Sequence, residues 1–212
     1  AAGHRSVAVP GTVAGLALAL EKYGTMSLAQ VIAPAIKLAE EGFVVSETLA
    51  GVIADNFKRA MPNAYLMSII APSGLPLEAG EIYKNPDLAK TLRLIAQEGS
   101  DAFYKGEIAK AIAADMKANK GLIDENDLAT YKAIEREPAS GTYRGYDIVS
   151  APAPVGGFLL IQSLNMLENY NLKFLGFDSA MKLHLFSEVL ARAFDDYYDV
   201  LGVARNASDE DL

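Results

Sequence analysis

Apolar and polar residues alternate with helical spacing along most of the chain. Between residues 12 and 22, Val13, Leu16 and Leu20 recur every three or four positions, which is typical of an amphipathic helix. Residues that commonly cap helices precede several later apolar stretches, and glycines follow them. We predict helices over residues 12–22, 28–41, 86–98 and 107–118, with others beginning after Ser46, Asp124 and Asp178 or Ser179.

Two stretches of the first half lack this spacing. Residues 6–9 are rich in valine and are followed by Pro10 and Gly11, so we predict a short strand there. Residues 62–84 are interrupted by prolines and glycines, which indicates a turn-rich connection with short extended pieces.

The stretch from Tyr131 to Tyr170 departs most clearly from the helical pattern. Arg144-Gly145 lies between aromatic and β-branched residues, which predicts a small antiparallel hairpin around residues 132–150 with positive φ in its turn. Two prolines then exclude a central strand. Residues 158–170 are apolar on nearly every side, which indicates a helix buried on both sides. The predicted fold class is α+β and mostly helical.

Composition narrows the class of protein. The 212 residues are enough for one domain or a large piece of one, and no composition shift marks a linker. The net charge of −8 argues against a nucleic acid or an anionic membrane as a partner. There is no cysteine, no signal peptide and no apolar run near the ~20 residues of a membrane span. The first residues lack a starting methionine and suggest a processed or excised piece.

Candidate chemistry is sparse. His4 and His184 are the only histidines, and no carboxylate cluster has calcium spacing, so we predict neither a metal nor a cofactor. Three groups could bind a ligand, but each has a simpler explanation. The Gly156-Gly157 pair could bind an anion or could allow close packing. The group of Tyr143, Arg144 and Tyr146 could contact a ligand or could pack across the strands. The group of Asp195, Asp196 and Asp199 could form a site or a solvated helix face.

Several motifs follow one another along the chain. Residues 6–16 read SVAVPGTVAGL, residues 33–43 read APAIKLAEEGF, and residues 143–168 run from Tyr-Arg-Gly-Tyr to Leu-Asn-Met-Leu-Glu. Phe103-Tyr104-Lys105-Gly106 and Gly121-Leu122-Ile123 lie between them. In this order, the motifs resemble the large subunit of γ-glutamyltranspeptidases, also called glutathione hydrolases. The chain departs from the family pattern at Val155, where two serines are common, and the run before the glycine pair is one residue shorter.

The resemblance implies part of an N-terminal-nucleophile hydrolase, an αββα sandwich, over residues 1–195. In that family a precursor cuts itself, and the new N-terminal threonine of the small subunit attacks the γ-glutamyl bond of glutathione. No such threonine motif occurs in this chain, so we assign no catalytic, cofactor-binding or metal-binding residue and expect the fragment alone to be inactive. The implied partners are the small subunit and γ-glutamyl compounds, and the implied location is periplasmic or extracellular.

Residues 196–212 resemble a different family as well. The run Asp196-Tyr197-Tyr198-Asp199-Val200-Leu201-Gly202-Val203 is similar to the opening of a DnaJ-type J-domain. This tail could therefore be the end of the family helix or the start of a J-domain. The alternative function is a catalytically inactive interaction module, or a J-domain fusion that docks an Hsp70.

Overall fold

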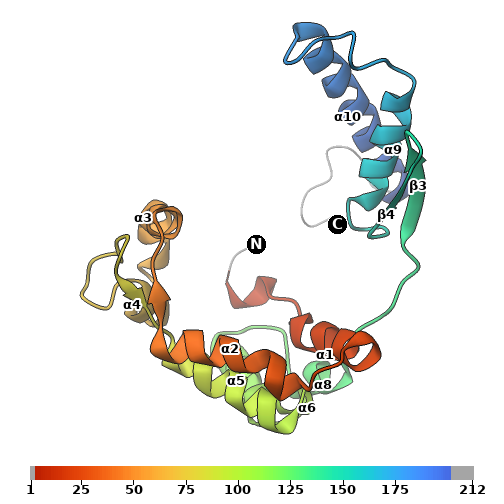
Figure 1. The fold of residues 1–212 in the computed structure, drawn as a ribbon. Coiled ribbons are helices and arrows are strands. Elements are labelled where there is room, and N and C mark those ends of the chain that lie inside the picture. Colours follow the sequence, from red (N-terminus) through yellow and green to blue (C-terminus); the bar gives the residue numbers. More distant parts are fainter. Residues whose placement is uncertain (1–2, 202–212) are drawn as a thin grey trace. The chain divides into compact units, whose positions relative to one another are not determined.

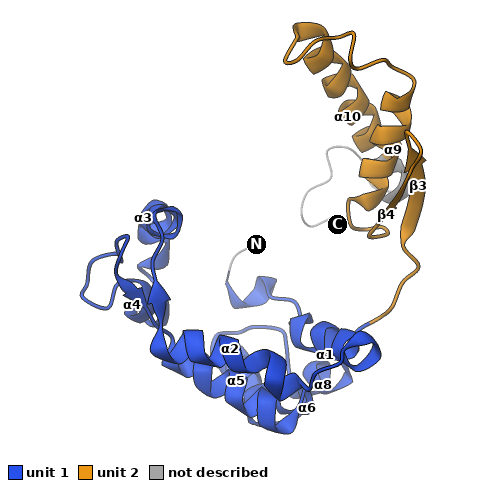
Figure 2. Ribbon diagram, in the orientation of Figure 1, with its two compact units in different colours: residues 1–133 blue, residues 134–212 orange. Residues whose placement is uncertain are grey.

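The computed structural model describes the backbone of residues 3–201 and the side chains of residues 3–196. The chain divides into two compact units, residues 1–133 and residues 134–212 (Figure 2). The boundary falls between Ala133 and Ile134, where the sequence composition showed no linker. Each unit is described below by itself.

Unit 1 is mainly helical (Figure 1). A single 3₁₀ turn, η1, spans His4–Ser6, and one antiparallel pair joins β1 (Phe43–Val44) to β2 (Ile82–Tyr83). Its helices are α1 (Thr12–Tyr23), α2 (Leu28–Glu41), α3 (Glu47–Ala60), α4 (Ala64–Ile70), α5 (Pro86–Glu98), α6 (Asp101–Tyr104), α7 (Glu107–Ala118) and α8 (Glu125–Thr130).

Capping hydrogen bonds mark several of the predicted helix starts. The Ser27 hydroxyl accepts the Gln30 N–H while the Gln30 side chain accepts the Ser27 N–H, which forms a capping box. Ser46 caps α3, and Asp124 caps α8. Each cap satisfies a backbone donor that the first turn of a helix leaves without a partner.

Two apolar clusters hold unit 1 together. One gathers α3, α4 and the turn that follows them around Val45, Ile53 and Leu77. The other joins α7 and α8 around Met116 and Leu128, and Leu128 is completely buried. Between these clusters α2 packs along α5 (Figure 1).

Two expectations for unit 1 were wrong. Residues 6–9 form no strand, because Ser6 belongs to η1 and the extended backbone at Val7 pairs with no neighbouring strand in the described part of the chain. Residues 62–84 contain the helix α4, which Asn63 caps by accepting the Leu66 N–H. The short extended piece expected there is confirmed as β2.

The described part of unit 2 combines a hairpin with two helices. Strands β3 (Ala139–Tyr143) and β4 (Tyr146–Ser150) pair antiparallel, with Tyr143 opposite Tyr146. Arg144 and Gly145 have φ of 51° and 82°, so the predicted positive-φ turn is confirmed. Helix α9 (Gly157–Glu168) packs on the hairpin, and α10 (Ala180–Leu201) packs on α9.

The close contact between α9 and the hairpin depends on small residues of β3. A Cβ added to Gly141 would lie 2.5 Å from the Ile161 Cγ2 atom of α9, so only glycine permits this approach. Ile161 and Ser163 are buried, whereas Leu160 is 49% exposed. The hairpin and α10 therefore cover much of α9 but leave part of its apolar surface open. The α+β, mostly helical fold class is confirmed.

Candidate functional site

The turn between β4 and α9 holds the glycine pair that could bind an anion. A Cβ on Gly157 would lie 2.1 Å from the Ala151 carbonyl oxygen and 2.6 Å from the Ser150 Oγ atom. A Cβ on Gly156 would meet only the Leu159 side chain, at an ordinary 3.9 Å. Close packing therefore requires glycine at 157 but not at 156, which supports the simpler explanation for Gly157.

A side chain from the segment before β3 also supports this turn. The Arg136 guanidinium donates a hydrogen bond of 3.2 Å to the Ala153 carbonyl oxygen. The contact joins the start of unit 2 to the segment between β4 and α9. The arginine therefore holds the backbone of this segment in place. A guanidinium has several N–H donors, so others stay available for further contacts.

The hairpin tip is attached to the C-terminal end of α9. The Arg144 N–H donates to the Glu168 carboxylate at 2.6 Å, and its guanidinium donates to the Tyr170 carbonyl oxygen at 3.3 Å. The same guanidinium lies 5.1 Å from the centre of the Tyr143 ring. A cation beside the last turn of a helix is favourable because exposed carbonyl groups accumulate there. Tyr146 is 73% exposed. Arg144 and Tyr143 therefore have a structural role here.

One acidic residue of α10 contacts a polar residue of α9. The Gln162 side-chain amide donates a hydrogen bond to the Asp196 carboxylate. The Gln162 Oε1 and Ser163 Oγ atoms are buried and have no hydrogen-bond partner among the residues whose side chains are described. Asp199 lies outside the residues whose side chains are described. These contacts join two helices, and sequence reasoning missed the polar pair because the helix pattern around Gln162 is almost entirely apolar.

A groove of about 790 Å³ lies between the end of α9 and the first half of α10. Its floor is apolar and includes Met166, Leu185 and the buried Val189. His184, Glu188 and Arg192 line it at intervals of four residues, so they share one side of α10. All three are exposed, and the groove is open to solvent.

The other histidine, His4, lies in unit 1. Its Nε2 atom is 2.9 Å from the Asp115 carboxylate, and Asp115 also accepts a hydrogen bond of 3.1 Å from the Asn119 amide. A Cβ on Gly121 would lie 3.2 Å from the His4 backbone, so η1 sits closely on the turn after α7. The pair therefore fastens η1 to α7.

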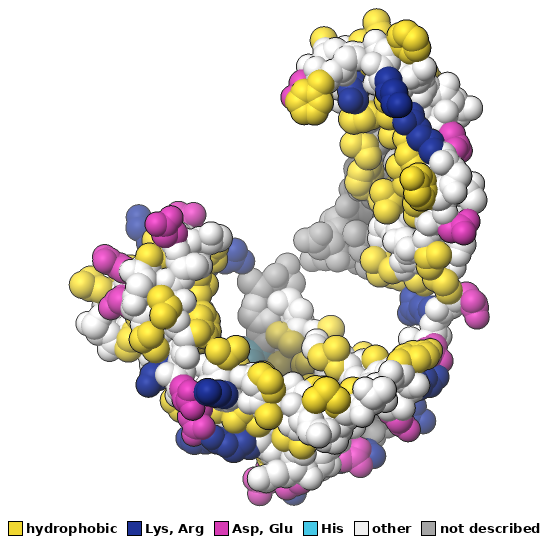
Figure 3. All heavy atoms as spheres, viewed as in Figure 1, with side chains coloured by type: hydrophobic (Ala, Val, Ile, Leu, Met, Phe, Trp, Pro, Cys, Tyr) yellow, Lys and Arg dark blue, Asp and Glu magenta, His cyan; other side chains and the backbone are white. Residues whose placement is uncertain are grey.

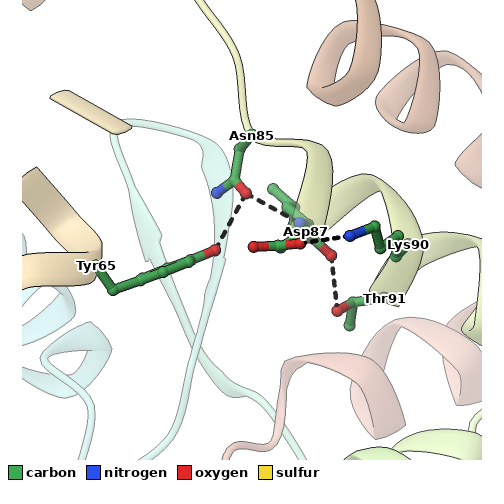
Figure 4. Close-up of polar contacts among 6 residues, drawn as sticks. Tyr65, Asn85, Asp87, Lys90 and Thr91 are labelled. Atoms are coloured by element: carbon green, nitrogen blue, oxygen red, sulfur yellow. Dashed lines mark hydrogen bonds and ion pairs between the residues drawn. The ribbon is translucent and has the colours of Figure 1, made fainter. Parts of the chain in front are cut away.

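A polar cluster at the start of α5 has the same kind of role (Figure 4). The Asn85 Oδ1 atom accepts the Leu88 N–H at 2.9 Å and the Tyr65 hydroxyl at 3.2 Å, and so joins α4 to α5. Lys90 donates to Asp87 at 2.8 Å, and this hydrogen bond raises the pKa of the lysine. The cluster caps a helix and holds two elements together.

These contacts stabilise helix ends and turns and do not converge on one point. Across residues 3–196, no group of three His, Asp or Glu side chains could hold a metal ion. The candidate groups from the sequence whose side chains are described are either engaged in local structure or exposed.

The comparisons with known proteins agree on one family. A family model described as gamma-glutamyltranspeptidase matches residues 1–208. The glutathione hydrolase proenzyme of Escherichia coli (strain K12) is 45% identical over 201 residues, which are 94% of this chain and 35% of that protein. The acylase ACY 1 proenzyme of Pseudomonas sp. (strain SE83) is 45% identical over 195 residues, which are 92% of this chain and 35% of that protein.

A solved structure shows the same fold. The crystal structure of Helicobacter pylori gamma-glutamyltranspeptidase matches with a TM-score of 0.89 and 38% identity, covering 97% of this chain and 60% of that chain. The chain spans about a third of the length of the curated relatives it matches. The family model includes most of the tail, and the comparisons give no support to a J-domain.

Proposed function

The chain belongs to the γ-glutamyltranspeptidase family, and we propose that it forms part of the large subunit of an enzyme that cleaves γ-glutamyl amide bonds. The observation that carries this proposal is the family match, which runs through both compact units. The wider family is one of enzymes, and both relatives described above are named as proenzymes.

The proposed chemistry is acyl transfer through a covalent intermediate. A threonine hydroxyl at the N-terminus of the small subunit attacks the γ-glutamyl carbonyl carbon, and its own α-amine takes the proton. The amide bond breaks, the leaving amine is protonated, and water or an acceptor amine then releases the glutamyl group. We place the nucleophile and its base outside this chain, whose helices and hairpin provide the supporting wall of the site.

The exposed apolar surface of each unit supports a partner subunit. In unit 1, Leu16 and Tyr23 of α1 are 65% and 79% exposed. In unit 2, Val149 of β4 is 67% exposed and Leu160 of α9 is 49% exposed. Large apolar surface of this kind marks a protein interface or a tendency to associate. We propose that the small subunit of the same precursor covers part of it.

A second candidate function is acylase activity on a different acyl group. The acylase ACY 1 proenzyme is as identical to this chain as the glutathione hydrolase proenzyme, at 45% in each case. Both reactions break an amide bond, so the same scaffold could serve either. On this proposal, most of the residues that select the acyl group lie outside this chain.

The location proposed for the whole enzyme is periplasmic or extracellular, on the strength of the family. Within the described residues, no helix combines the length and apolar character that a membrane crossing requires.

The test compares the purified chain with the complete product of its gene. We expect the chain alone to release no p-nitroaniline from γ-glutamyl-p-nitroanilide above a heat-killed control. The complete product should divide into two polypeptides and release p-nitroaniline. A complete product that divides but acts only on an acyl amide would favour the acylase, and one that neither divides nor acts would favour an inactive interaction module.

A further inference from the structure

The connection between α9 and α10, which we call the α9–α10 loop (residues 169–179), carries two unusually exposed aromatic side chains. Phe174 is 88% exposed and Phe177 is 90% exposed, more than any other large apolar residue in the part of the chain that the structure describes. Figure 3 shows hydrophobic side chains beside Lys or Arg side chains at the end of unit 2 that holds this loop.

Hydrogen bonds hold the backbone of the loop on both sides of the two rings. The Phe174 N–H donates to the Asn171 carbonyl oxygen at 3.1 Å, and the Ser179 hydroxyl accepts the Lys182 N–H at 3.2 Å. Leu172 and Leu175, on the same turns, are half-buried. The turn therefore places its leucines inward and presents its phenylalanines outward.

Basic side chains flank the aromatic pair. The Lys182 ammonium lies 5.8 Å from the centre of the Phe177 ring, and Lys173 directly precedes Phe174. Asp178 is the one acidic residue of the loop itself. The chain has a net charge of −8, but in physiological salt charges act over about 8 Å, so a surface touching this loop meets mainly the local lysines.

We propose that the α9–α10 loop is an interfacial anchor that inserts Phe174 and Phe177 into the headgroup region of a lipid bilayer. A projecting pair of rings suits a soft, flat surface, where the rings lose contact with water. Lys173 and Lys182 complement the phosphate groups of the lipids, and anionic lipids should strengthen binding because each nearby lysine is attracted to them. This proposal is independent of the enzymatic function.

The chain contains no tryptophan, which allows a direct test. Phe177→Trp places a single tryptophan in the loop, and Leu75→Trp gives a matched control at another position that is 71% exposed. On titration with phosphatidylglycerol–phosphatidylcholine vesicles, we expect the Phe177→Trp emission to move to shorter wavelength and to be quenched by lipids brominated near the headgroup. The Leu75→Trp emission should not change.

Vesicle sedimentation provides the second readout. Phe174→Ser with Phe177→Ser should lower the partition coefficient at least about tenfold, because burial of even one phenylalanine is worth that factor. Lys173→Gln with Lys182→Gln should weaken binding to anionic vesicles more than to neutral ones. Phe177→Trp emission that vesicles leave unchanged would overturn the proposal. Emission that is already shifted without vesicles and reverts on dilution would show that the loop docks on a second copy instead.

Discussion

Tyr104 is the residue whose removal should most clearly test how unit 1 is held together. It is 5% exposed, and its hydroxyl donates to the Pro10 carbonyl oxygen at 2.7 Å and accepts the Ala14 N–H at 3.1 Å. Ala14 is in the first turn of α1, where Gly11 offers no side-chain cap, so the tyrosine replaces the missing cap. Its ring stacks on Tyr131 with centroids 5.5 Å apart.

Tyr104→Phe removes the hydroxyl and keeps the ring. Each hydrogen bond contributes about 0.5–1.5 kcal/mol, and two groups lose their partner, so we expect the free energy of unfolding of unit 1 to fall by about 1–3 kcal/mol. The lower half of that range applies if water reaches the half-buried Ala14 N–H. Stacking on Tyr131 should persist, and α1 should lose stability first.

Amide hydrogen exchange measured by mass spectrometry suits this prediction, since it follows α1 separately from unit 2. We expect peptides covering Thr12–Tyr23 to exchange about 5- to 150-fold faster in Tyr104→Phe, the factor that 1–3 kcal/mol implies. Tyr146→Phe removes a hydroxyl from a residue that is 73% exposed and should change nothing. Exchange of α1 that is the same in Tyr104→Phe and the unaltered chain would refute the capping role.

Three further changes follow from the same structure. Gly157→Ala should destabilise unit 2 by about 1–3 kcal/mol, because the added Cβ would overlap the Ala151 carbonyl oxygen. Gly156→Ala should be tolerated. Urea unfolding followed by circular dichroism gives the free energy of unfolding of each variant. Asn85→Ala should cost about 1 kcal/mol through the lost cap of α5, and an unchanged urea midpoint would contradict this. Burial raises the pKa of Tyr104 above its ordinary value of 10.0, so the unfolded state loses this proton more readily than the folded state. The resulting stability is present below pH 10.0 and is lost as the pH rises through the raised value. Above pH 10, the free energy of unfolding should therefore fall less steeply in Tyr104→Phe than in the unaltered chain.

Local signals in the sequence were enough to predict much of the fold. Arg144-Gly145 predicted the hairpin turn because few residues tolerate positive φ in succession. Ser27, Ser46 and Asp124 predicted helix starts because their side chains satisfy backbone donors within three residues. These features depend on neighbours along the chain, and such neighbours can be recognised without coordinates.

Features that depend on distant partners could not be predicted in this way. Residues 6–9 have strand-like composition, but a strand also needs a neighbour to pair with, and none is present in the described residues. Helix α4 was missed because the prolines on both sides of it indicated turns, and its own apolar pattern is short. The capping role of Tyr104 joins positions about 90 residues apart, and the division at residue 133 reflects contacts that no local composition records.

The candidate site residues were also predicted only in part. The predicted packing role of Gly157 agrees with the short approach of Ala151. Nothing in the sequence indicated the Gln162–Asp196 contact or the buried Ser163 hydroxyl, which has no partner among the described side chains. An isolated polar residue in an apolar helix can face several directions. The assignment of no catalytic residue to this chain stays a prediction.

The most direct test of the central claim is the rate of p-nitroaniline release from γ-glutamyl-p-nitroanilide, measured for this chain and for the complete product of its gene at equal molar concentration. The account predicts release by the complete product and none by the chain above the heat-killed control. Release by the chain alone, lost when its own side chains are substituted, would show that the reacting groups lie within these 212 residues and would contradict the account.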